Sequence, residues 1–160
     1  MADSPRTDPD VDLRQPGDRV ELRARPATTL VVIAGGGVLG TLARFGAQTA
    51  LPHRPTGFPW ATFGVNVLGC LLIGVLMVLL TRVWVGRPLL RPFLGVGVLG
   101  GFTTFSAYVL DVEQAVRAGV PATALAYLTG TVLAALGAVW AGETVTGWLL
   151  DRAGVGRVAG

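Results

Sequence analysis

The fold is decided by residues 93–110, which read FLGVGVLGGFTTFSAYVL and contain no charged side chain. An apolar run of this kind has about the length that a helix needs to cross a hydrocarbon core of about 30 Å. In lipid a helix is the expected structure, because it satisfies its own backbone hydrogen bonds. The middle of the run is poor helix, since Gly100 and Gly101 are followed by Thr103 and Thr104. The segment predicts a membrane span that is broken at its middle.

Such a break would free backbone amide and carbonyl groups at a depth that water does not reach. Backbone of this kind is tolerated where it lines a cavity or contacts an ion. The alternative is an unbroken helix whose glycines form a packing notch against a neighbour. The residues of this segment leave both interpretations open.

Three further apolar runs accompany this segment, and short joints rich in proline and glycine connect them. The four runs are Leu30–Ala50, Phe58–Leu80, Phe93–Leu110 and Ala122–Gly142. We expect spanning helices at about 30–50, 58–80, 93–117 and 122–145, which together form one four-span domain over residues 28–148. Glycines recur in the runs and predict close helix packing through small residues. The fold class is all-α and integral to the membrane, surrounded by lipid.

The composition agrees with this fold class. The chain has 160 residues, of which 14% are charged, and its mean hydropathy is +0.59; soluble domains carry about a quarter charged residues. Residues 1–27 are polar and proline-rich, so we expect a disordered tail and not a signal peptide, and residues 149–160 form a C-terminal tail. The net charge of +3 is too small to indicate nucleic-acid binding. The single cysteine, Cys70, excludes an intrachain disulfide.

The distribution of arginine predicts the orientation. All thirteen basic residues are arginine, and ten of them lie in the two termini or in the joint between the second and third spans. Only Arg54 and Arg117 lie on the opposite side. Because arginine-rich loops stay in the cytoplasm, we expect a multi-pass protein of a prokaryotic plasma membrane with both termini cytoplasmic.

Polar and aromatic side chains inside the spans are the candidates for chemistry. They are Arg44 in the first span, Thr62 and Asn66 in the second, Phe105 and Tyr108 in the third, and Tyr127 and Thr131 in the fourth. An amide or a charge in hydrocarbon is costly and needs a partner, and the edge of an aromatic ring attracts an anion weakly. For Asn66 the alternative to ion ligation is an interhelical hydrogen bond, and for the aromatic residues it is packing.

Other patterns carry no function. Two stretches spell GxGxxG, at Gly35–Gly40 and Gly95–Gly100, but neither follows a strand of a βαβ unit, so they do not predict dinucleotide binding. The lone His53 lies in a joint without a second ligand or a nucleophile nearby. We expect no enzyme, since no nucleophile, base or metal cluster is recognisable.

Three segments together resemble the CrcB or Fluc family of fluoride channels. Residues 36–45, 62–70 and 100–108 read GGVLGTLARF, TFGVNVLGC and GGFTTFSAY, and are similar to the family patterns GGxxGAxxRY, TFxVNxxGS and GGFTTFSTF in order and spacing. The resemblance covers about residues 30–147. It implies a passive, fluoride-selective channel that exports cytoplasmic fluoride and protects against its toxicity. It also implies an antiparallel dimer with two narrow pores.

The resemblance also implies roles for residues at matching positions. The fluoride pathway would comprise Asn66, Phe105, Tyr108, Thr62, Ser106, Tyr127 and Thr131. Asn66 would donate its amide hydrogens, and the rings of Phe105 and Tyr108 would offer their edges. The backbone carbonyls of Gly100 and Thr103 would hold a structural Na⁺ at the dimer centre, since carbonyl oxygens suit a hard cation. Arg44 would have an electrostatic or structural role.

The chain departs from the family pattern at a few positions. Tyr108 stands where the family usually has phenylalanine, so its hydroxyl would ligate the ion or narrow the pore. Ala107 replaces the usual threonine, and Asp111 lies near an acidic position that often follows the motif.

The arginine bias bears on the partner. It favours one orientation, whereas an antiparallel homodimer needs both. The alternatives are therefore a homodimer and a heterodimer with an oppositely oriented paralogue. A non-conducting subunit is a further alternative, and so is a small multidrug exporter, although the carboxylate that an exporter needs in its first span is missing.

Overall fold

The computed structural model describes residues 26–155, whose regular secondary structure is entirely helical. The elements are α2 (Pro26–Ala50), α3 (Trp60–Arg82), η1 (Arg91–Leu99), α4 (Gly100–Phe102), α5 (Phe105–Arg117) and α6 (Pro121–Arg152). Four stretches, Ala27–Ala50, Trp60–Arg82, Arg91–Arg117 and Pro121–Arg152, are long and apolar enough to cross a membrane. The prediction of four long apolar helices is confirmed. Most of both predicted tails, residues 1–25 and 156–160, lies outside the described residues.

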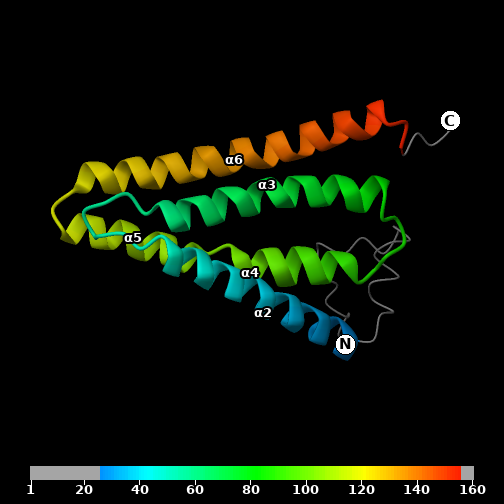
Figure 1. Cartoon of the computed structure of the whole chain (residues 1–160), viewed down its shortest axis with the longest axis horizontal. Helices are drawn as coiled ribbons and strands as arrows, with labels where there is room; N and C mark the ends of the chain where they lie inside the picture. The colour runs from blue at the N-terminus through cyan, green and yellow to red at the C-terminus, as the bar shows by residue number, and fades with distance from the viewer. Residues whose placement is uncertain (1–25, 156–160) are drawn as a thin grey trace, which may run out of the picture.

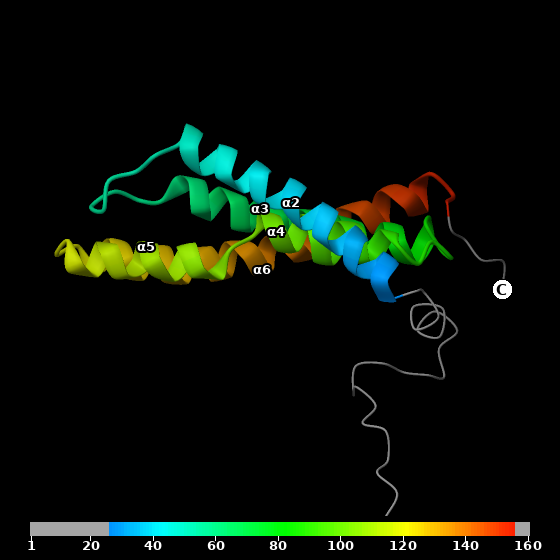
Figure 2. The ribbon, with the colours of Figure 1, turned by 90° about the horizontal axis from the view of Figure 1, so that it is seen from below.

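The four spans run up and down in an open bundle. Figure 1 shows the start of α2, the joint between α3 and η1, and the end of α6 at one end of the bundle. The α2–α3 joint and the α5–α6 joint lie at the other end. Helix α3 packs along α6, whereas α2 packs along η1 and α4, which it crosses obliquely in Figure 2. Large apolar side chains such as Leu39, Leu133 and Trp140 are exposed, as suits helices whose surroundings are as apolar as leucine.

Glycines bring the backbones together where α3 meets α6, a contact that we name the α3–α6 seam. A Cβ atom at Gly74 would clash with the carbonyl oxygen of Val139, and one at Gly142 would clash with that of Leu71. No side chain larger than hydrogen fits at either glycine without moving a helix backbone. The seam is therefore specified by two small residues that face each other's helix.

A second glycine contact joins α2 to the third span, and we name it the α2 seam. A Cβ atom at Gly40 would clash with the carbonyl oxygen of Val98, and one at Gly101 would meet the carbonyl oxygen of Gly37 at 2.5 Å. Glycines that allow close backbone contact therefore bring together both pairs of spans.

The third span changes its helical geometry along its length. η1 is a wide helix of the π type, in which the N–H of Gly100 reaches the carbonyl of Gly95. Gly100 and Gly101, where the sequence predicted a break, are helical. The extended residues are Thr103 (φ −75°, ψ 158°) and Thr104 (φ −149°, ψ 126°). The helix is interrupted at these two residues, but the span bends only slightly there (Figure 1), so the predicted division of the third span is not confirmed.

The last helix is longer than predicted. The sequence predicted its end at about residue 145, but α6 continues to Arg152. Strong helix formers such as Leu149 and Leu150 lie in this extension. The helix ends before Gly154, whose φ of +68° places it in the left-handed conformation that glycine adopts after a helix.

Candidate functional site

The side chain of Asn66 binds the backbone of Thr104, where the third span departs from helical geometry. The Thr104 N–H donates to Oδ1 of Asn66 at 2.8 Å, and Nδ2 of Asn66 donates to the Thr104 carbonyl at 3.0 Å. The amide thus replaces the helical partners that an extended residue loses. This pair ties α3 to the third span and explains why that span bends only slightly. One hydrogen of Nδ2 remains for another acceptor.

Both threonines use their hydroxyl groups to hold the helix ends. The Thr103 hydroxyl donates to the carbonyl of Leu99 at 3.0 Å, within the helix that ends there. The Thr104 hydroxyl accepts from the N–H of Ala107 at 3.2 Å and so caps the start of α5. The sequence Thr103-Thr104 therefore supplies a hydrogen bond to each of the two helical segments that it separates.

The backbone carbonyls around Thr103 are released from the helical ladder. The usual donor to the Gly100 carbonyl would be the Thr104 N–H, which is bound to Asn66. The Thr103 carbonyl accepts from Nη1 of Arg44 at 3.0 Å. Arg44 is half-buried, and this contact gives it a structural role across the α2 seam. Within residues 26–155 no three His, Cys, Asp or Glu side chains gather into a metal site. A cation at this place would bind carbonyl oxygens.

Three aromatic rings from α5 and α6 lie in contact. The ring of Tyr108 is 5.9 Å from that of Phe105 and 5.2 Å from that of Tyr127, between ring centroids. Tyr108 is buried, and its hydroxyl donates to the carbonyl of Leu128 at 2.6 Å. Phe105 is 76% exposed. The row of rings therefore runs from the buried centre of the subunit to its surface.

Tyr127 is the most enclosed of the large side chains, with 1% of its surface exposed. Its hydroxyl donates to Oδ2 of Asp111 at 3.3 Å and also contacts the hydroxyl of Thr62. The Thr131 hydroxyl donates to the Tyr127 carbonyl at 2.7 Å. On the far side of the carboxylate, Nε2 of His53 lies 3.6 Å from Oδ1 of Asp111.

These contacts bring most of the predicted site residues together. Phe105, Tyr108, Tyr127, Thr62 and Thr131 belong to one connected set from α3, α5 and α6, and Asn66 binds the backbone of Thr104, the residue before Phe105. Ser106 is exposed on α5, outside this set. Sequence reasoning missed the role of Thr104 and the approach of His53 to Asp111. Asp111 follows Tyr108 by three residues on one helix, and that spacing was the available signal.

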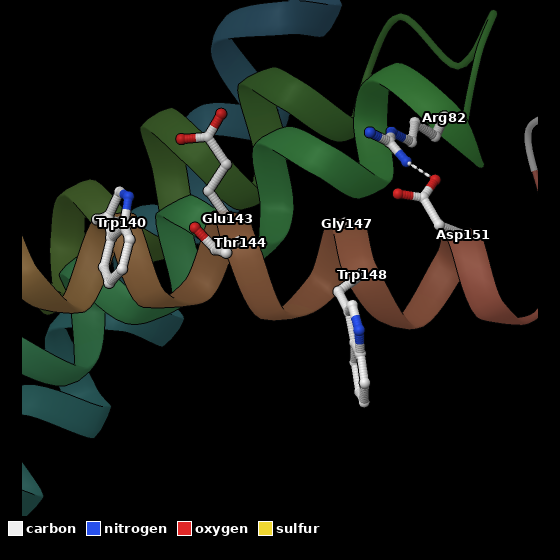
Figure 3. Close-up of a pocket in the computed structure, with 7 residues that line it drawn as sticks. All are labelled: Arg82, Trp140, Glu143, Thr144, Gly147, Trp148 and Asp151. Carbon is white, nitrogen blue, oxygen red and sulfur yellow. Dashed lines mark hydrogen bonds and ion pairs between the residues drawn. The ribbon is translucent and has the colours of Figure 1, made fainter.

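A shallow groove lies near the end of the α3–α6 seam where α6 ends. Figure 3 shows its lining: Arg82 of α3 and Trp140, Glu143, Thr144, Gly147, Trp148 and Asp151 of α6. Nη1 of Arg82 lies 2.6 Å from Oδ1 of Asp151, and the guanidinium of Arg152 stacks on the Trp148 ring at 3.9 Å. The groove contains none of the predicted site residues.

Comparison with known proteins identifies relatives across most of the chain. A family model described as "CrcB-like protein, Camphor Resistance (CrcB)" matches residues 31–143. The chain is similar to a Streptomyces avermitilis protein named fluoride-specific ion channel FluC 2, with 49% identity over 125 residues, 78% of this chain and 79% of the relative. A Nocardia farcinica protein, also named fluoride-specific ion channel FluC 2, is 54% identical over 128 residues, 80% of this chain and 91% of the relative. A Streptomyces coelicolor protein named fluoride-specific ion channel FluC 1 is 52% identical over 114 residues, 71% of this chain and 74% of the relative.

Proposed function

The chain belongs to the CrcB family, and we infer that it is a membrane-spanning subunit of a fluoride-specific ion channel and not an enzyme. The observation that carries this conclusion is the match over residues 31–143, a region that contains the contacts of Asn66, Tyr108 and Tyr127. The resemblance noted in the sequence is thereby confirmed. Fluoride leaves the cytoplasm passively, down its gradient, and this flow protects the cell against fluoride.

The pathway follows from what fluoride requires. The ion is small and strongly hydrated, so a narrow pore must replace its water with hydrogen-bond donors. We propose Asn66 and Tyr127 as the main donors, supported by the free hydrogen on Nδ2 of Asn66 and by the central place of the Tyr127 hydroxyl. Phe105 and Tyr108 offer ring edges, which assist weakly. The proposed pathway also includes Thr62, Thr131 and the exposed Ser106.

Reconstitution of the purified chain tests the function. Liposomes loaded with potassium fluoride or potassium chloride receive valinomycin, and an electrode records the anion that leaves. We expect fluoride to leave and chloride to stay. Asn66→Asp abolishes fluoride flux, because it places a negative charge beside the ion, whereas Gly64→Ala on the same helix has open space around it and is the matched control. Fluoride flux equal to that of liposomes without protein, or equal loss of fluoride and chloride, would overturn the proposed function.

A second subunit is proposed to complete the pathway. The exposed ring of Phe105 and the exposed Ser106 leave the row of polar and aromatic groups open on one side. An antiparallel partner in the plasma membrane would cover it. The partner is either a second copy or an oppositely oriented paralogue; the strong arginine bias favours the paralogue, and Streptomyces relatives that carry the numbers 1 and 2 are consistent with it.

Labelling of the two kinds of joint distinguishes these partners. In a Cys70→Ala background, Thr56→Cys reports the α2–α3 joint and Val85→Cys reports the joint between α3 and η1. Both positions are exposed. With cytoplasmic termini, a membrane-impermeant maleimide outside the cell labels position 56 alone. Equal labelling of both positions indicates dual insertion and a homodimer.

A structural Na⁺ is the remaining proposal for this site. The chemistry of the donors fits: carbonyl oxygens suit a hard cation, and the Gly100 carbonyl lacks its usual helical donor. The Thr103 carbonyl has one lone pair left beside its bond from Arg44. Two carbonyls from each of two subunits would hold the ion. The melting temperature of the protein should rise when Na⁺ replaces N-methylglucamine, and equal melting in both cations argues against the site.

A further inference from the structure

His53 of the α2–α3 joint, Asp111 of α5 and Tyr127 of α6 form a chain of contacts. The α2–α3 and α5–α6 joints lie at the same end of the bundle (Figure 1). One oxygen of the Asp111 carboxylate lies 3.6 Å from Nε2 of His53, and the other accepts the Tyr127 hydroxyl at 3.3 Å. The side chain of Asp111 is 10% exposed and that of His53 is 25% exposed. A single carboxylate therefore connects a titratable imidazole near the surface to a buried hydroxyl.

We propose that His53 controls the electrostatic barrier that fluoride meets beside Tyr127, so that fluoride current rises when His53 becomes protonated. This inference rests on the proposed function and on the place of Tyr127 in the pathway. It gives His53 and Asp111 positioning roles, because both act on the ion through the Tyr127 hydroxyl and through charge.

The effect on the current follows from the charges of His53 and Asp111. With neutral His53, the Asp111 carboxylate repels an approaching anion, and it also holds the hydrogen of Tyr127 that the anion needs. Protonated His53 cancels the charge of the carboxylate and competes for its lone pairs through a charge-assisted contact. The Tyr127 hydroxyl is then free to turn its hydrogen toward fluoride. Both effects act in the same direction.

Histidine is the side chain that ordinarily changes charge between about pH 5 and 8, and the chain contains only one. On α5, Glu113 forms an ion pair with Arg117. In the α2–α3 joint, the exposed Arg54 follows His53 in sequence. The groups that α6 and α3 place in this chain of contacts are Tyr127 and the neutral Thr62.

Fluoride currents across planar bilayers test the inference, because neutral HF carries no current. Currents of the full chain are recorded with equal pH on both sides, at about pH 7.5 and about pH 5.5. We expect about threefold more current at the lower pH, the factor for one elementary charge several ångströms away through water. In His53→Gln and in Asp111→Asn, the ratio of the current at the lower pH to that at the higher pH should be about one. Glu113→Gln removes the carboxylate two residues after Asp111 in sequence and should keep the wild-type ratio of the currents at the two pH values.

The outcomes separate this inference from the function on which it rests. Absence of fluoride current at every pH would overturn the proposed function. A fluoride current that ignores pH in the wild-type protein, or one that keeps its pH dependence in His53→Gln, overturns the role of His53 alone. Elution from a sizing column checks each variant for folding. If Asp111→Asn does not fold, the His53→Gln comparison still decides, since His53 lies in a joint at the end of the bundle.

Discussion

The α3–α6 seam and the α2 seam bring helices together in the same way but differ in what surrounds the contact. At the α3–α6 seam, Gly74 and Gly142 face the backbone of two regular helices. At the α2 seam, Gly40 and Gly101 make equally close contacts, but the extended Thr103 and Thr104 begin two residues after Gly101. There the side chains of Arg44 and Asn66, from neighbouring helices, bind the released backbone. Glycine therefore sets the distance between helices, while loss of helical hydrogen bonds decides where polar side chains are needed.

The largest effect is expected for Asn66→Leu, which removes both bonds to Thr104. An amide and a carbonyl would lose their partners where no water replaces them, at a cost of about 1–3 kcal/mol each. We expect the free energy of unfolding in detergent to fall by about 4 kcal/mol. Fluoride flux should fall at least about tenfold, because the geometry of the third span depends on this pair.

Gly64→Ala, two residues earlier on α3 with open space around it, controls for changes to the helix itself. A stable Asn66→Leu protein that still conducts would show that the third span holds its shape without the amide. The contrast between the two seams would then have no energetic basis.

The two seams can be compared directly through Gly40→Ala and Gly142→Ala. Each added methyl group meets an opposing carbonyl, so we expect each to lower the free energy of unfolding by about 1–3 kcal/mol. Gly40→Ala should also reduce fluoride flux per folded protein about tenfold, because a small displacement next to Thr103 disturbs the pathway. Gly142→Ala should leave flux within about twofold, since it acts on stability alone.

Gly46→Ala on α2 and Gly137→Ala on α6 are the matched controls, because nothing lies within 4 Å of an added Cβ at either position. Equal loss of flux in Gly40→Ala and Gly142→Ala would contradict the separation of packing from conduction. Normal stability in both variants would show that the seams tolerate the extra methyl.

The fold was predictable because apolar length determines a span, and each of the four predicted apolar runs coincides with a long helix. The exact position of the bend was not, because the predicted segment of poor helix covered Gly100 and Gly101 as well as the two threonines. The extended residues are the two threonines, and Asn66 binds the backbone of Thr104 from another helix. Which helix faces which is a tertiary property that residue types alone do not encode.

The same reason explains the parts of the site that sequence analysis missed. His53 and Asp111 are 58 positions apart and meet only because two joints lie at one end of the bundle. The sequence left two roles for the Tyr108 hydroxyl, ligation of the ion or narrowing of the pore. Its contact with the Leu128 carbonyl gives a third role. The hydroxyl forms a hydrogen bond between α5 and α6.

Tyr108→Phe tests that role and should have a smaller effect than the glycine variants. Removing one hydrogen bond of 2.6 Å between helices should lower the free energy of unfolding by about 1 kcal/mol. Flux should change by less than about threefold, because the lost hydrogen is already committed to a carbonyl. A collapse of flux would show that the hydroxyl binds fluoride, and a large increase would show that it narrows the pore.

The smallest effect is expected at the ion pair of Arg82 and Asp151, in the groove of Figure 3. Both side chains are well exposed, at 40% and 59%, so the pair should contribute less than about 1 kcal/mol and should weaken in high salt. A double-mutant cycle with Arg82→Gln and Asp151→Asn measures this coupling. The closeness of Gly74 and Gly142 to the opposing backbone already fixes α3 against α6, so the charges add little. A coupling above about 2 kcal/mol, or a fall in fluoride flux, would show that this seam also depends on polar contacts.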